Sequence, residues 1–117
     1  MINPNEAIDY IIKHSQAYAK AKAQVTYLTE YRKTKKAICF QSSPRTTMAE
    51  KEADAYAHPE YQAVLEGLRE AVEEAERLRW MLIAAQARVD VYRTQEASNR
   101  SISVIWYLRS KALRPMP

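Results

Sequence analysis

The fold is decided by residues 59–98, which read PEYQAVLEGLREAVEEAERLRWMLIAAQARVDVYRTQEAS. Alanine, glutamate and arginine, all good helix formers, dominate this stretch, and its one proline stands at the first position, where a helix tolerates it. Apolar residues recur every three or four positions, which places them on one face of an α-helix. This predicted face comprises Tyr61, Leu65, Leu68, Val72, Ala75, Leu78, Leu82, Ala85, Val89 and Tyr92. We therefore predict a helix over residues 59–98.

A second helix of nearly equal length is predicted over residues 4–41. Asn3 can cap its start, Pro4 suits the first helical position, and Glu6 complements the positive end of the helix dipole. The stretch QSSPR at 41–45 ends it, because proline disfavours helix in the residue before it. The predicted apolar face comprises Ile8, Ile11, Ile12, Ser15, Tyr18, Ala21, Val25 and Leu28.

A short helix is predicted between the two long ones, over residues 47–57, where Thr47 and Glu50 form a capping-box pattern. Two long helices joined by a short element indicate an antiparallel hairpin. Gly67 is the only glycine, which argues against a β-rich fold with many turns. We predict an all-α fold for residues 1–117, a single domain built as a long, coiled-coil-like antiparallel helical hairpin. Such a hairpin has a thin core, so we also expect a homo-oligomer.

Residues 99–117 are predicted to form an apolar C-terminal tail after a polar break at 98–101. The tail contains the run ISVIWYL at 102–108, whose pattern fits either a strand or a short helix. One interpretation is that it folds back over the apolar band at residues 80–87 or packs on a second subunit. The other is that it docks a partner protein, with Trp106, Tyr107 and Arg109 as anchors, because tryptophan, tyrosine and arginine often dominate interface energy.

Charge is distributed in blocks along the chain. Residues 10–45 carry eight Lys or Arg and one acid, whereas residues 46–76 carry nine acids and two basic residues. An antiparallel hairpin brings these blocks together, so cross-helix ion pairs are expected. They would join Arg32, Lys33, Lys35 and Lys36 to Glu66, Glu70, Glu73 and Glu74. Residues 77–117 carry eight basic residues and two acids and have no comparable acidic neighbour.

This unbalanced basic block is the predicted contact surface for DNA, with single strands favoured. Its candidate residues are Arg88, Arg93, Arg100, Arg109, Lys111 and Arg114, with Lys20, Lys22, Tyr27 and Tyr31 in the first helix as secondary candidates. Basic residues attract the phosphate backbone, and exposed aromatic rings can stack on unpaired bases. The alternative for the tyrosines is that they line the helix contact with their hydroxyls reaching water.

No catalytic arrangement is visible in the sequence, so we predict that the protein is not an enzyme and uses no cofactor or metal. His14 and His58 lie far apart in the sequence, and neither has a pattern of flanking ligands. Cys39 is the only cysteine, which we take to exclude both an intramolecular disulfide and a metal site built from cysteines. The N-terminus does not resemble a signal peptide, and no apolar stretch is long enough to cross a membrane. We therefore expect a cytoplasmic protein.

Residues 53–99 and, more loosely, the stretch YRKTKKAI at 31–38 resemble small helical proteins of bacteriophages and prophages that are encoded near recombination genes. This resemblance implies a non-enzymatic accessory role in phage DNA recombination or replication, exerted in the host cytoplasm by binding DNA or a DNA-processing protein. Two alternatives remain. One is a protein that inhibits a host nuclease or defence complex by binding it, and the other is a structural coiled-coil oligomer. The resemblance assigns no role to any individual residue.

Overall fold

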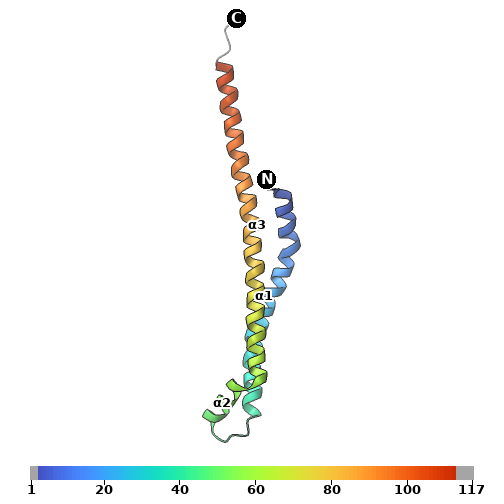
Figure 1. Ribbon diagram of the computed structural model, residues 1–117, viewed down its shortest axis with the longest axis vertical. Helices are drawn as coiled ribbons and strands as arrows, with labels where there is room; N and C mark the ends of the chain where they lie inside the picture. The colour runs from blue at the N-terminus through green and yellow to red at the C-terminus, as the bar shows by residue number, and fades with distance from the viewer. Residues whose placement is uncertain (1–2, 113–117) are drawn as a thin grey trace.

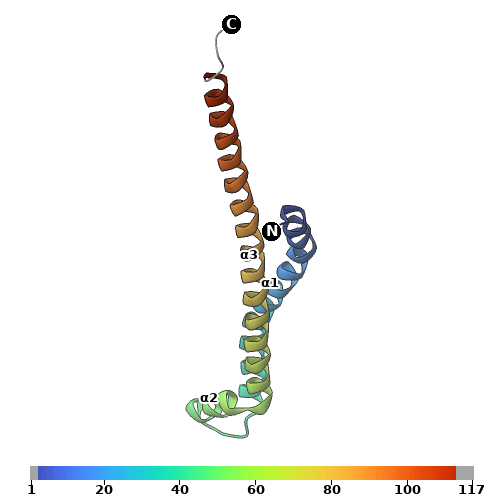
Figure 2. The ribbon, with the colours of Figure 1, turned by 45° about the horizontal axis from the view of Figure 1, so that its top comes forward.

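The computed structural model describes residues 3–112, which form three helices and no strand (Figure 1). They are α1 (Pro4–Gln41), α2 (Met48–Ala57) and α3 (Pro59–Ala112). The long helices α1 and α3 run antiparallel, and α2 lies at the end where they are connected (Figures 1 and 2). The all-α helical hairpin is thereby confirmed. None of the helices in this described range has the length and apolar character needed to cross a membrane.

Local capping explains where each helix begins. The Asn3 side chain accepts hydrogen bonds from the backbone N–H groups of Asn5 and Glu6, at 3.0 and 3.4 Å. Thr47 Oγ1 accepts one from the N–H of Glu50 at 3.2 Å, which confirms the predicted cap of α2. These bonds satisfy N–H groups that have no partner within the helix.

The predicted end of α3 is wrong. The helix does not break at residues 98–101 but continues without interruption to Ala112, so residues 99–112 belong to α3 and do not form a separate tail. The run at 102–108 is therefore helix and not strand, and it does not fold back over residues 80–87. At 1.5 Å per residue, the 54 residues of α3 span about 80 Å, well beyond the start of α1 (Figure 2).

The face that α1 turns towards α3 follows an alternating spacing of four and three residues. It comprises Ala7, Ile11, His14, Tyr18, Ala21, Val25, Leu28, Arg32, Lys35 and Cys39, all buried or half-buried. The prediction was wrong at Ile8, Ile12 and Ser15, which are exposed, the two isoleucines by 43% and 69%. The regular spacing continues back from Tyr18 to His14, Ile11 and Ala7. It therefore places a polar residue at 14 and a small one at 7 on this face, although the neighbouring Ile8 and Ile12 are more hydrophobic.

The facing side of α3 follows the same rule. It comprises Tyr61, Val64, Leu68, Ala71, Ala75, Leu78, Leu82, Ala85, Val89 and Tyr92. Val72, predicted to pack here, is 42% exposed, and Ala71 takes its place. Many of these side chains are small, so the two helices share a thin contact that ends near Tyr92.

Ion pairs between helices occur near the connected end of the hairpin. Lys35 Nζ lies 2.9 Å from a carboxylate oxygen of Glu60 in α3, and Lys36 Nζ lies 3.3 Å from one of Glu52 in α2. The predicted partners of the basic end of α1 were therefore wrong, because they lie further along α3. Among the described residues, the remaining pairs of the long helices join residues three apart, namely Glu30–Lys33, Glu66–Arg69, Glu74–Arg77 and Glu76–Arg79.

Candidate interaction surface

The connected end of the hairpin, residues 39–61, which we call the corner, contains the best-packed part of the protein. Cys39 from α1, Ala55 from α2 and Tyr61 from α3 are 1%, 0% and 7% exposed and form one cluster. Phe40 and Leu65 pack against them. One residue from each helix thus meets in a single core, which fixes the three helices to one another.

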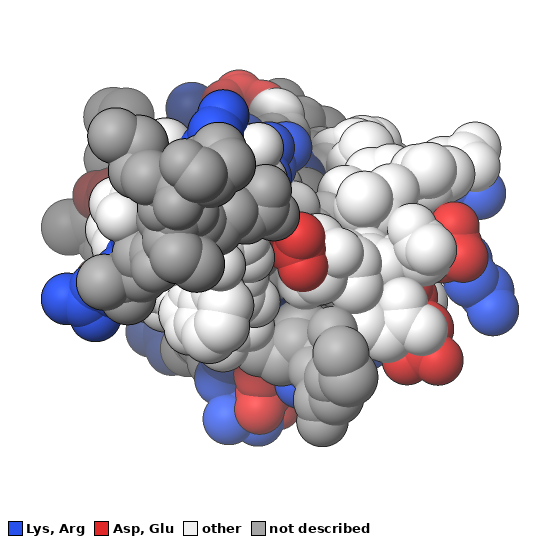
Figure 3. Space-filling view, turned by 90° about the horizontal axis from the view of Figure 1, so that it is seen from above, with Lys and Arg blue, Asp and Glu red and all other residues white. Residues whose placement is uncertain are grey.

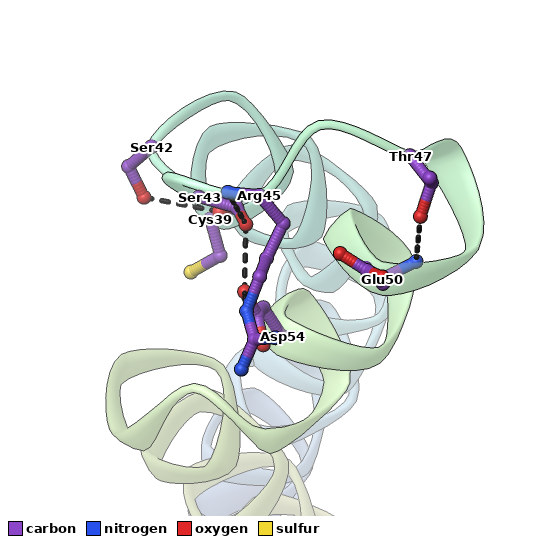
Figure 4. A network of polar contacts seen from close by, with 7 residues as sticks. All are labelled: Cys39, Ser42, Ser43, Arg45, Thr47, Glu50 and Asp54. Atoms are coloured by element: carbon purple, nitrogen blue, oxygen red, sulfur yellow. Dashed lines mark hydrogen bonds and ion pairs between the residues drawn. The ribbon is translucent and has the colours of Figure 1, made fainter.

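Polar contacts close the loop that surrounds this core (Figure 4). Ser43 Oγ donates a hydrogen bond to Asp54 Oδ2 at 2.7 Å and accepts one from the backbone N–H of Arg45 at 3.2 Å. The guanidinium of Arg45 lies 3.6 Å from the same carboxylate. Ser42 Oγ donates to the carbonyl of Cys39 at 3.0 Å. The loop between α1 and α2 is therefore tied to both helices.

The corner also brings together three groups that the sequence gave no reason to connect. Cys39 Sγ, a ring nitrogen of His58 and a carboxylate oxygen of Glu60 lie within 4.8 Å of one another, and their chemical types are those of zinc ligands. Two of the three have other roles. Lys35 donates a hydrogen bond to Glu60, which lowers the pKa of that carboxyl and raises the pKa of Lys35. His58 Nδ1 accepts the N–H of Glu60 and caps α3. These contacts hold the corner together.

The other end of the molecule is different in character. Every residue from 97 to 112, a segment we call the arm, is exposed. Six large apolar side chains of the arm are between 56% and 69% exposed, namely Ile102, Val104, Ile105, Trp106, Tyr107 and Leu108. Single exposed apolar residues are common, but six in seven positions form a continuous apolar band around the helix, and exposed apolar areas of this kind mark interaction sites.

The apolar residues of the arm lie on opposite sides of the helix. Trp106 lies fourteen residues after Tyr92 and so continues the side of α3 that faces α1 lower down. The intermediate positions on that side are polar, including Asn99 and Ser103. Ile105 lies towards the opposite side of the helix. The predicted aromatic anchors for a partner, Trp106 and Tyr107, are 69% and 61% exposed, and the third anchor, Arg109, is exposed as well.

The predicted DNA-binding residues do not form one cluster. Arg93, Arg100 and Lys111 lie on one side of α3, as the spacings of seven and eleven residues require, and Tyr107 lies beside them with Lys111 Nζ 5.9 Å from its ring centre. Arg88 and Arg109 project from other sides. Viewed along the long axis, Lys and Arg appear on several sides of the molecule (Figure 3). The remaining candidate, Arg114, lies outside the described residues.

The secondary candidates in α1 lie far from the arm. Lys35 of α1 lies beside Glu60 of α3, and the two helices run in opposite directions. Lys20, which precedes Lys35 by fifteen residues, is therefore level with residue 75 of α3. That position is about 27 Å along α3 from Arg93. Lys22 and the two tyrosines lie further still. Tyr27 and Tyr31 stack on each other, with ring centres 5.8 Å apart and planes 7° from parallel. The structure therefore does not join these four residues to the basic residues of the arm.

Comparison with other proteins adds no information on function. No protein-family model, no curated protein and no solved structure matches this chain. The phage resemblance stays a prediction, and what supports a function is the geometry of the arm.

Proposed function

We propose that this protein acts by binding a partner protein through the arm. The observation that carries the proposal is the continuous band of six exposed apolar side chains on a helix that nothing in residues 3–112 covers. Buried aromatic anchors contribute most to many protein interfaces, and Trp106 with Tyr107 provides two adjacent ones. The hairpin then holds the arm at a fixed distance from the corner.

The composition of the arm supports this proposal. Ile102, Val104 and Ile105 are β-branched and, with several serines and Asn99, are weaker helix formers than alanine or leucine. A helix of about this length is marginal in water unless it packs against something. A partner helix on the Trp106 side, in line with α1, would supply that packing.

The test is affinity capture from host-cell lysate with the full-length chain and two variants. Trp106→Ser removes the central anchor, and Ile12→Ser is the matched control because both parent residues are 69% exposed. We expect a protein that the native chain and Ile12→Ser retain, and that Trp106→Ser retains at least about tenfold less, as for a hot-spot residue. Direct titration with that purified protein should reproduce the difference. Equal retention by all three chains would contradict the proposal.

DNA binding is a second candidate function, favoured by the side of α3 that carries Arg93, Arg100 and Lys111. None of these three forms an ion pair with another described residue. Tyr107 lies beside them and offers a ring on which a base can stack. Three cations spread over about 27 Å are few, so we expect modest affinity.

Fluorescence anisotropy with labelled single- and double-stranded DNA at several salt concentrations tests this candidate. If the protein contacts three phosphates of a single strand, a plot of the logarithm of the binding constant against the logarithm of the salt concentration should have a slope of about −2. Arg100→Gln should reduce the slope by about 0.7, whereas Lys13→Gln, which lies on α1 and outside this side of α3, should not change it. A DNA affinity that does not change with salt concentration would exclude this surface as a phosphate-binding site.

The phage resemblance suggests the setting for either activity. A protein that recruits a DNA-processing enzyme through the arm fits an accessory role in recombination or replication. A protein that blocks a host nuclease or defence complex through the same arm would use the same residues, and the identity of the captured partner distinguishes the two.

A further inference from the structure

A second regular stripe runs along α3 on the side turned away from α1. Its positions alternate in spacing by four and three residues, as in the contact face of a coiled coil. We call it the outer stripe, and it comprises Trp80, Ala84, Ala87, Val91, Thr94, Ser98, Ser101 and Ile105. All eight are exposed and none is charged.

The outer stripe is not an extension of the hairpin contact. Leu78 and Leu82 pack towards α1, and Trp80 lies midway between them, two residues from each. Two residues along a helix correspond to a rotation of about 200°, so Trp80 points away from α1. Trp80 is 59% exposed and Ile105 is 61% exposed. The stripe is therefore a complete helix-packing face that no described part of the chain covers.

Between Trp80 and Ile105 the order of side-chain sizes along the outer stripe is symmetrical, with a large residue at each end and smaller residues between them. The same spacing continues beyond Ile105 to Leu108 and Ala112, which are also exposed. We infer that two copies of this chain pair along this stripe as antiparallel α3 helices, related by a twofold axis between residues 92 and 93. Trp80 of one copy then packs on Ile105 of the other, Ala84 lies opposite Ser101, and Val91 lies opposite Thr94.

The residues that flank the stripe select this register. In an antiparallel pair, each flanking side meets the equivalent side of the other helix. This brings Met81 beside Ile102 of the second copy, and Ile83 beside Val104. All four are exposed in the single chain, by 46%, 60%, 42% and 56% in that order. A shift of seven residues towards the C-terminus would instead place Met81 beside Arg109 and Ile83 beside Lys111.

Charges agree with the same register. Beyond the apolar contacts, Glu74 lies beside Arg109 of the second copy, and Glu76 lies beside Lys111. The two basic residues form no ion pair with another described residue of their own chain, whereas both glutamates are held by arginines three positions on. Opposite charges at flanking positions set the orientation and register of coiled coils. The basic end of the arm thus comes close to the acidic part of α3 only when that part belongs to a second copy.

This pairing goes beyond the proposed function and leaves its two aromatic anchors, Trp106 and Tyr107, accessible. The dimer covers Ile102, Val104 and Ile105, whereas Tyr107 lies on the opposite side of the arm and Trp106 lies outside the outer stripe. One side of the arm would therefore bind the second copy and the other the partner protein. The two claims can fail separately, because one is read from the mass and cross-linking of the purified chain and the other from capture by Trp106→Ser.

Disulfide trapping tests the register directly. The native thiol is first removed by Cys39→Ala, and the full-length chain then receives either Ala84→Cys or Ser101→Cys, both at small exposed positions. In the inferred dimer, residue 84 lies opposite residue 101 of the second copy. Two copies of the same variant would hold their thiols about 25 Å apart, which is too far for a disulfide.

We expect rapid disulfide formation on oxidation when the two variants are mixed in equal amounts, and none when either is oxidised alone. Intact mass identifies the mixed product, and light scattering of the native chain should give twice 13.5 kDa. A monomer that forms no mixed disulfide would overturn the inference. So would a cross-link within either variant alone, because that result requires a parallel or shifted pair.

Discussion

Replacing Tyr61 by alanine is expected to destabilise the protein by about 3–5 kcal/mol, the range seen when a buried aromatic side chain is cut to alanine. Tyr61 is 7% exposed, and it packs at the corner in the cluster that joins all three helices. Its ring also meets that of Tyr56 edge to face, with centres 5.8 Å apart. Because the rest of the hairpin contact is thin, the other packing within residues 3–112 offers little to offset this loss.

The measurement is chemical unfolding followed by circular dichroism at 222 nm, a wavelength that reports helix. Tyr27→Ala is the control, because Tyr27 is 60% exposed and exposed substitutions change stability by roughly 0.5 kcal/mol or less. A Tyr61→Ala variant within about 1 kcal/mol of the native chain would show that the corner does not hold the hairpin together.

Replacing Ile105 by glutamate is expected to weaken the inferred dimer at least about a hundredfold, which corresponds to about 2.7 kcal/mol. The twofold axis makes each dimer use this position twice, so one substitution removes two apolar contacts with Trp80. It also places a carboxylate in each of those contacts, where burial of an unpaired charge is costly. Sedimentation equilibrium of both chains over a range of concentrations measures the change.

Asn99→Glu is the matched control for this effect. It adds the same charge six residues earlier in the arm, at an exposed position outside the outer stripe. Its dimer should dissociate at nearly the same concentration as that of the native chain. If both variants dissociate equally, the effect comes from added charge on the arm and not from the outer stripe.

The helix starts were predictable because capping depends on a few adjacent residues. Asn3 and Thr47 act as caps in the structure, as their sequence patterns indicated. The end of α3 was not predictable in the same way. Residues 98–101 are polar and form helices less readily than alanine, yet they contain neither proline nor glycine, so nothing in them forces a break. The prediction of a separate tail relied too heavily on the weak helix propensities of residues 98–101.

The candidate surfaces were only partly predictable. Trp106 and Tyr107 were identified from residue type alone, and the structure shows both exposed on a helix. The outer stripe was missed because its middle is mostly alanine, serine and threonine, which carry little hydrophobic signal, and because the helix was expected to break at residues 98–101, before the stripe reaches Ile105. The grouping of Cys39, His58 and Glu60 depends on how two connections fold around the corner, and no local pattern reports that.

Because α3 is one continuous helix, only insertions and deletions of certain lengths keep the arm in the same orientation relative to α1. One residue inserted between Tyr92 and Ile102 would advance the arm by only 1.5 Å but rotate it by about 100°, separating Trp106 from the side that faces α1. Seven inserted residues would move the arm by about 10 Å and rotate it by only about 20°. Insertions and deletions in this connection should therefore be tolerated in whole heptads, so the reach of the arm can change only in steps.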